Sequence, residues 1–319
     1  MTISNHLQEW YGLPAFDFPD AEAQAAGKVE LPAPASVAWR ISVDSYESEE
    51  DWPDAFVRFA AAVDTTQVRA LIVGSWSDAY DSGPGEVIAA LLAAKERLPR
   101  LRGLFLADIT FEECEISWIN QGEVTPLLDG FPQLEQFGVR GGQDLAFPAV
   151  KHERLRSLVV ETGGLDAEVV RGIAGSELPA LEHLDIWLGT SWYGANADVS
   201  DLEPFLSGTR LPSLTHLALR NSEIQDEIAV AVSGAPVVAR LKTLDLSMGT
   251  LGDDGAEALL TGQPLTHLKK LDLHHHFMSS TMVQRLSDAL IPAGVELDVS
   301  ESERSGTNAR EDRYTAVAE

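Results

Sequence analysis

A short pattern of leucines recurs along the chain and constrains its fold more than any other feature. The segments LTHLAL, LKTLDL and LKKLDL begin at Leu214, Leu241 and Leu268, so consecutive copies lie 27 residues apart. Further copies of the frame L-x-x-L-x-L, some with Val, Ile or Phe in place of Leu, begin at Val68, Leu101, Leu134, Leu155 and Leu181. With divergent copies at both ends, about ten copies extend from residue 38 to residue 300. A fixed period of this length indicates a stack of similar units.

Each copy predicts one strand followed by one helix. In the segment x-Leu-x-Leu-x the leucines alternate with other residues, which is the period of a β-strand with one buried face. The residues that follow have helical spacing, as in 86–92 and 282–290, and Pro84 and Ser279 or Ser280 stand where helices should begin. Each unit can bury its apolar side only against the next unit. We therefore expect an α/β solenoid, a horseshoe with a parallel inner sheet of about ten strands and with helices outside.

The recurring frame resembles the leucine-rich repeats of the long, ribonuclease-inhibitor-like type, in a bacterial member of that family. The segment LKTLDLSMGTLGDDGAEALL at 241–260 carries the resemblance best. The resemblance implies an interaction scaffold with no chemistry of its own. One position departs from the family, because the ninth residue of the repeat is not the usual Asn or Cys. Gly163, Gly189, Ser222, Gly249 and His276 stand there instead. We therefore expect less regular turns, held by glycine and by packing.

The two ends of the chain do not fit the frame. Residues 1–36 include the segment WYGLPAF and a proline-rich stretch, and we expect them to form a cap that shields the first repeat. Residues 37–300 form the repeat domain. Residues 301–319 are polar and have no apolar period, so we expect a disordered tail there.

The charge of the chain limits its partners. With 23 basic and 50 acidic residues the formal net charge is −27, whereas binding to nucleic-acid phosphates or to an anionic membrane needs patches of Lys and Arg. We expect neither nucleic acid nor a membrane as a partner. The single Cys114 excludes an intramolecular disulfide, and the first residues lack the features of a secretory leader, so we expect a cytoplasmic protein. The oligomeric state is left open.

The residues between the frame leucines should face the inner wall of the horseshoe, and their character changes along the chain. In the N-terminal half they are small or apolar, whereas in the C-terminal half they are acidic and include His, Trp and Arg. The candidate contacts are His183, Asp185, Trp187, His216, Arg220, Asp245, Asp272 and His274. This gradient suits a protein or peptide with a basic and an apolar portion. The alternative is that the aspartates are ordinary solvent-facing strand residues.

Aromatic residues accompany the three longest repeats. The repeats that start at Val68, Leu101 and Leu181 have 33 residues each, whereas the others have 21 to 27. The extra residues follow the strand, so in a solenoid they should emerge on one rim. They include Trp76, Tyr80, Trp118, Trp192 and Tyr193. Exposed rings would give this rim a contact surface, whereas rings that fold back would only fill gaps in the turns.

An enzymatic alternative also follows from the inner face. His183 and His216 should be lateral neighbours if the repeats stack in register, and Asp185 lies close by, so a metal-dependent hydrolase could use these three side chains. Against this, the sequence contains no nucleophile elbow, phosphate-binding loop, His-Glu-x-x-His motif or cysteine pair. Cys114 lies among glutamates, which disfavour the thiolate. We therefore predict a non-enzymatic binding scaffold without a metal or cofactor.

Overall fold

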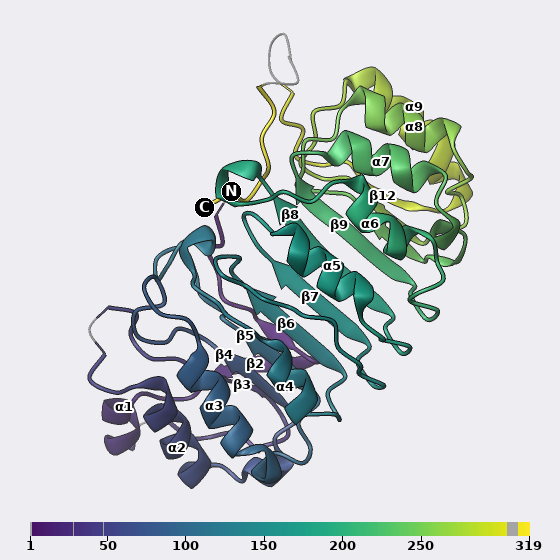
Figure 1. The fold of residues 1–319 in the computed structure, drawn as a ribbon. Coiled ribbons are helices and arrows are strands. Elements are labelled where there is room, and N and C mark those ends of the chain that lie inside the picture. Colours follow the sequence, from purple (N-terminus) through teal and green to yellow (C-terminus); the bar gives the residue numbers. More distant parts are fainter. Residues whose placement is uncertain (1, 28, 47, 305–311) are drawn as a thin grey trace.

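The computed structural model describes residues 2–27, 29–46, 48–304 and 312–319. Its strands form one sheet in which neighbours in the chain are neighbours in space (Figure 1). The strands are β1 (Glu9–Trp10), β2 (Leu13–Asp17), β3 (Ala38–Ile41), β4 (Ala70–Val73), β5 (Gly103–Leu106), β6 (Gln136–Arg140), β7 (Ser157–Glu161), β8 (His183–Gly189), β9 (His216–Ser222), β10 (Thr243–Asp245), β11 (Lys270–Asp272) and β12 (Glu296–Asp298). The pairings from β2 to β12 are parallel, and β1 pairs antiparallel with β2.

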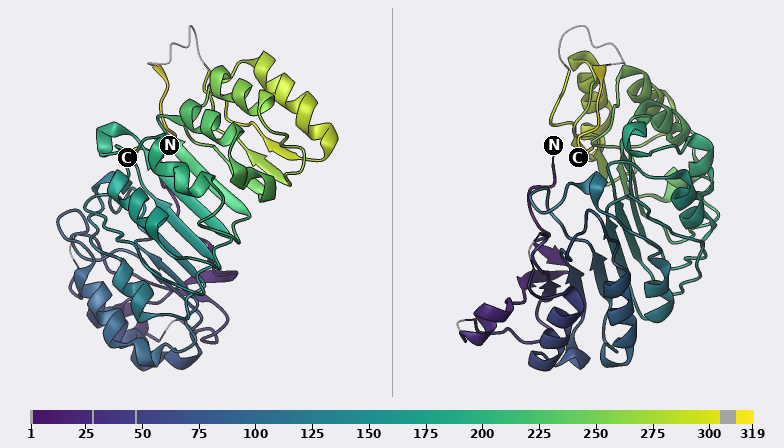
Figure 2. Two further views of the ribbon diagram at one scale, coloured as in Figure 1. Left: turned by 45° about the vertical axis from the view of Figure 1, so that its right-hand side comes forward. Right: turned by 60° about the vertical axis from the view of Figure 1, so that its left-hand side comes forward.

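Helices of the repeats cover one side of this sheet, while both chain ends lie on the other side (Figure 2). The helices are α1 (Ala21–Ala25), α2 (Trp52–Ala62), α3 (Gly85–Ala93), α4 (Thr125–Gly130), α5 (Ala167–Gly175), α6 (Val199–Leu206), α7 (Gln225–Ser233), α8 (Asp253–Thr261) and α9 (Ser280–Leu290). In the described part of the chain, each helix is too short or too polar to cross a membrane. The predicted α/β solenoid is confirmed, with one difference. The ten strands β3–β12 fall in the repeats, and β1 and β2 come from residues 1–36.

The frame leucines fill the layer between sheet and helices. Leu217 pairs in register with Leu184 on one side and Leu244 on the other, and all three are fully buried. The helices begin where the sequence indicates, since α3 follows Pro84 and the Ser279 side chain caps α9. The shortest repeat has no room for a helix, and its residues 141–156 connect β6 to β7 without one.

Residues 1–36 do more than shield an edge. Strand β2 pairs with β3 and so covers the edge of the repeat sheet. Strand β1 then places Trp10 on the inner face, where its ring packs against Phe105 and against the side chains of Ala70 and Ile72. These four residues are buried. The apolar N-terminal half of the inner wall is therefore an internal packing surface, covered by the chain itself.

The last residues of the chain are also packed against the repeats. Ala316 and Val317 are 1% and 2% exposed, and they contact Trp187 and Met248 on the inner side of the sheet. The expectation of a disordered tail is wrong for residues 312–319, because these residues bury apolar side chains that the sequence pattern did not assign to any repeat. Residues 305–311 of that expected tail lie outside the described residues.

Two turns of the later repeats have a side-chain bond at the ninth position. At the ninth position, Ser222 Oγ accepts a hydrogen bond from the backbone two residues further on. In the repeat that follows Leu268, His276 contacts the carbonyl of Val299 through Nε2 at 3.0 Å. Ser and His thus supply side-chain bonds of the kind that Asn or Cys provides in the family. The eighth residue adopts a left-handed conformation, with φ between 53° and 65°, at Asn221, Met248, His275 and Glu301.

Candidate binding surface

The acidic residues of the inner wall are paired within the chain. The Arg220 guanidinium lies between two aspartates, with Nη2 2.7 Å from Asp185 Oδ2 and Nη1 3.5 Å from Asp245 Oδ2. Both aspartates are more than 90% buried. Burial opposes the charge of Arg220, but the two carboxylates outweigh it and raise its pKa. The carboxylates in the C-terminal half of the inner wall are therefore partly neutralised by Arg220, and this part of the wall presents less negative charge than the sequence suggests.

Trp187 belongs to the same network. Its ring lies under Arg220, with the guanidinium carbon 5.1 Å from the ring centroid, and it is 6% exposed. The C-terminal residues Ala316 and Val317 cover it. Trp187 is thus a packing residue in this structure.

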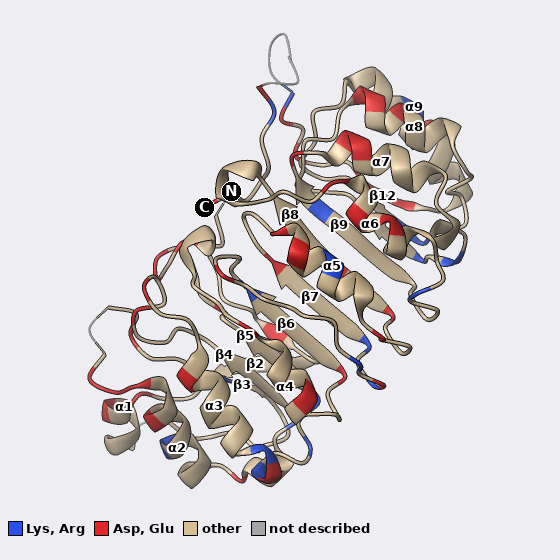
Figure 3. Cartoon of the chain, viewed as in Figure 1, with Lys and Arg blue, Asp and Glu red and all other residues tan. Residues whose placement is uncertain are grey.

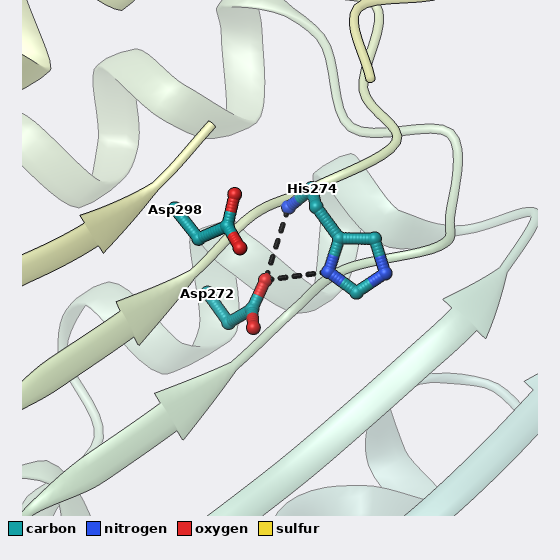
Figure 4. A group of neighbouring side chains, drawn as sticks. All are labelled: Asp272, His274 and Asp298. Carbon is teal, nitrogen blue, oxygen red and sulfur yellow. Dashed lines mark hydrogen bonds and ion pairs between the residues drawn. The ribbon is translucent and has the colours of Figure 1, made fainter. Parts of the chain in front are cut away.

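Asp272, His274 and Asp298 form a second cluster on the inner wall, at the ends of β11 and β12 (Figure 4). Asp272 Oδ1 accepts from the His274 backbone at 3.2 Å and lies 2.7 Å from its Nδ1, while Lys270 Nζ lies 2.9 Å from Oδ2. Burial opposes ionisation, but these bonds hold the pKa of Asp272 well below its usual range. The bond to Asp272 raises the pKa of His274.

Among the described residues, this second cluster could surround a metal ion, because its possible ligand atoms lie within 4.8 Å of one another. Asp272 already bonds Lys270 and the ring of His274, however. A metal would have to displace both partners before it could bind Asp272.

His183 and His216 lie side by side on β8 and β9, as the register predicts. Their rings stack with centroids 3.8 Å apart and planes 20° apart. Burial lowers the pKa of both, and the neighbouring His183 helps to lower that of His216 to about 4. Asp185 is held by Arg220, at 2.7 Å and 3.0 Å. The pair is therefore neutral at pH 7, and the hydrolase alternative, which needs all three side chains, stays a prediction.

Aromatic rings of three long loops meet at one rim. Tyr80, Trp118 and Tyr193 form a row, with centroid distances of 5.7 Å and 6.2 Å. Tyr80 is 56% exposed, Trp118 is 38% exposed, and the neighbouring Trp192 is 84% exposed. We call these four residues the aromatic rim. Trp76 does not belong to it, because it is 4% exposed and its Nε1 donates to the carbonyl of Ser82.

The loops that carry the aromatic rim lack basic residues. Residues 74–84, 107–124 and 190–198 contain no Lys or Arg. The first two loops carry exposed or half-buried acidic side chains (Figure 3), namely Asp78, Asp81, Glu112, Glu113 and Glu115. The rim therefore combines aromatic surface with negative charge.

Known proteins with leucine-rich repeats match parts of the sequence and the fold of this chain. A family model described as Leucine Rich repeat matches residues 210–233 and 241–260, within the part of the chain that holds the clearest copies of the frame. A crystal structure of a protein from Bacteroides fragilis matches the chain with a TM-score of 0.76 and 26% identity, over 94% of this chain and 76% of that one. The chain carries leucine-rich repeats and has the fold of a leucine-rich-repeat solenoid.

Two further comparisons give no additional support for the fold or the family. An internalin of Listeria monocytogenes matches this leucine-rich-repeat protein with 13% identity over 76% of this chain and 69% of that one. Its TM-score of 0.36 is too low to establish a common fold. No curated protein matches the chain. These matches leave the ribonuclease-inhibitor-like type of repeat as a prediction.

The repeat pattern does not predict the contact between the repeats and the C-terminal residues. Asn221 and Met248 hold that segment through hydrogen bonds to its backbone. Both residues stand at the eighth position of the leucine-rich repeat, next to the ninth position, where the family usually has Asn or Cys. The sequence shows an Asn in this turn, but nothing in the repeat frame indicates that it is buried or that a remote segment reaches it.

Proposed function

We propose that this leucine-rich-repeat protein is a non-enzymatic scaffold that binds another protein through the aromatic rim. The partner presents a segment with both basic and apolar side chains. It is neither a nucleic acid nor a membrane, since the chain has a net charge of −27. We place this role in the cytoplasm.

The row of Tyr80, Trp118 and Tyr193 carries the proposal. Three loops far apart in the sequence bring their rings within 5.7 Å and 6.2 Å of each other, and Tyr80 and Trp118 remain exposed there. Aromatic side chains give a large contact area at a small cost in conformational entropy, and they are enriched among residues that dominate binding energy. Lys or Arg of a partner can also lie over such rings.

Charge supports a basic partner at the rim more than at the inner wall. Asp185, Asp245 and Asp272 are bound to cations of the chain, whereas Glu112 and Asp81 on the rim loops are exposed. The inner wall contributes secondary contacts, through the stacked pair of His183 and His216.

The test is capture of a partner from an extract of the source organism, followed by titration of the identified partner. Trp118→Ala should weaken binding by about 2 kcal/mol, or roughly thirtyfold, as for a central aromatic contact. Binding should also weaken at high salt, because ionic strength screens surface charge. Val230→Ala on α7 is the control, because this side chain is 54% exposed on the helical side. Unchanged affinity in the Trp118 variant would contradict the proposal.

The non-enzymatic assignment has its own test. Titration of the wild-type protein with zinc is expected to show no binding that depends on His183 or His216. Zinc binding that disappears in a His216→Ala variant would instead favour the hydrolase alternative.

A further inference from the structure

We propose that residues 312–319 occupy a peptide-binding groove as an intramolecular ligand, and that a partner segment of the same chemistry displaces them. The groove accepts an extended peptide in which Arg-Tyr precedes small aliphatic residues. This inference deepens the proposed function, because the groove ends at the aromatic rim.

The repeats hold the segment by its backbone. Asn221 Oδ1 accepts from the backbone N–H of Val317 at 3.0 Å, and Asn221 Nδ2 donates to the carbonyl of Val317 at 2.6 Å. A side-chain amide that bonds both groups of one residue recognises a peptide backbone. Asn221 is fully buried. Water therefore does not reach these bonds while the segment is docked.

Two neighbouring repeats add equivalent contacts. The carbonyl of Met248 accepts from the backbone N–H of Ala316 at 2.7 Å, and His275 Nε2 lies 3.1 Å from the carbonyl of Tyr314. Asn221, Met248 and His275 all stand at the eighth position of their repeats and share the left-handed conformation. The turns thus form a ladder of contacts across three repeats.

The spacing of this ladder suits an extended chain. Two steps between adjacent strands cover roughly 10 Å, and three residues in extended conformation cover about the same distance. The segment from Tyr314 to Val317 crosses those two steps. This match allows a peptide without regular secondary structure, which in this segment bends at Ala316, to cross the repeats and bond at each one.

Side chains fill complementary sites along the groove. Arg313 Nη1 donates to Asp226 Oδ2 at 2.7 Å and to the carbonyl of Thr250 at 3.0 Å. The Tyr314 ring lies edge-on to His275 and Phe277, at 5.4 Å from each. The groove therefore provides an anionic anchor for Arg and an aromatic shelf for Tyr.

The far end of the groove is apolar and close-fitting. Ala316 and Val317 pack against Ile116, Trp187 and Met248. Gly163 has no side chain where the segment passes, and a Cβ atom there would collide with the carbonyl of Ala318. The backbone of the segment can thus approach the repeats closely at this end.

The segment finally reaches the aromatic rim. Ser117 Oγ, next to Trp118, donates to the carbonyl of Ala318, and the Tyr193 hydroxyl donates to Glu319. The bond to Glu319 raises the pKa of Tyr193 to about 12. A partner that binds the rim would meet this segment, so displacement of the segment and binding at the rim are coupled.

The experiment uses the full chain with its own segment loosened by Arg313→Ala and Val317→Asp. The probe is a fluorescent peptide with the sequence DRYTAVAE of residues 312–319. The apparent affinity for the peptide is proportional to the fraction of molecules whose groove is open. If the segment is docked in nine-tenths of wild-type molecules, the loosened variant should bind the peptide about tenfold more tightly than the wild type. Adding Asn221→Ala to the loosened variant should abolish that gain.

A second measurement covers the case in which the loosened variant does not fold. In the wild-type chain, excess peptide should accelerate hydrogen exchange of the Ala316 and Val317 amides and leave the amides of β9 unchanged. A folded, loosened variant that binds the peptide no better than the wild type would overturn the inference. So would a wild-type dimer that dissociates on loosening, because the segment would then belong to a second copy. If the loosened variant does not bind the peptide more tightly while Trp118→Ala still weakens partner binding, the peptide-binding groove is rejected and the proposed function stands.

Discussion

The ring of Trp10 lies edge-on against the ring of Phe105, with centroids 5.0 Å apart and planes at 79°. Phe105 is on the inner wall, so a segment that precedes the repeats packs where a partner of a leucine-rich-repeat protein could otherwise bind. This contact covers the apolar half of the inner wall. The surface that remains accessible to a partner therefore lies at the rim and on the C-terminal repeats.

Trp10→Ala should destabilise the protein by about 3–5 kcal/mol, the usual loss when a buried Trp is truncated. Trp10 is 6% exposed, and its removal would uncover Phe105 and Ile72. Urea unfolding measures the change. Trp192→Ala is the matched control, since Trp192 is 84% exposed and its loss should cost no more than about 0.5 kcal/mol. Equal losses in both variants would argue against the packing described above.

Asp108→Asn should also destabilise the fold, by about 3–5 kcal/mol. Asp108 is fully buried, and its carboxylate oxygens lie 2.7 Å from Arg40 Nε and 3.0 Å from Arg140 Nη1. Removing its charge leaves buried guanidinium groups without full compensation. Denaturant unfolding should be compared with that of Asp288→Asn on the exposed side of α9, which should remain close to the wild type.

The stacked histidines predict a loss of stability in acid. Burial lowers the pKa of His183 and of His216 in the folded protein, the latter to about 4, whereas unfolded His titrates near 6.5. Between these values the unfolded chain binds more protons, so stability should fall as the pH drops below about 6.5, by up to about 1.4 kcal/mol per pH unit for each proton. His216→Phe keeps a stacked ring and should reduce this slope in chemical unfolding at several pH values.

His274 provides an internal control with the opposite sign. Its pKa is raised by Asp272, so its contribution to stability is present below about pH 6.5 and is lost as the pH rises through the folded value. His274→Gln should therefore lower stability mainly at acid pH. A His216→Phe variant with the same acid slope as the wild type would show that the stacked pair is not the source.

Asp245→Lys should disrupt the inner wall and cost about 3–5 kcal/mol. Asp245 is 7% exposed and lies 3.5 Å from Arg220, so the change places two cations together in a buried site. Thermal and urea unfolding measure the loss. Glu203→Lys on the exposed face of α6 makes the same change in charge and should shift stability by no more than about 0.5 kcal/mol. Similar unfolding of the two variants would mean that Asp245 is not committed to Arg220.

The candidate site was predicted unevenly. The repeat lengths located the aromatic rim, because extra residues after a strand emerge on one rim, and Tyr80, Trp118 and Tyr193 do meet there. The repeat lengths do not distinguish Trp76 from the exposed rings, although Trp76 turns inward and bonds the carbonyl of Ser82. The strand pattern placed Asp185 and Arg220 on the inner wall, but it did not indicate that they neutralise each other.

The sequence alone determined the solenoid, because the alternation of leucines fixes which face of each strand is buried and a fixed period forces the next unit to complete that burial. The tertiary structure decided which parts of the inner surface stay open. Trp10 and Val317 lie outside the repeat frame, and their partners Phe105 and Asn221 are 95 or more residues away in the sequence. The local period of the sequence indicates whether a residue lies on the buried or the exposed face of its own strand or helix. Contacts such as Trp10 with Phe105 depend on where segments remote in the sequence come to lie, and only the folded chain determines that.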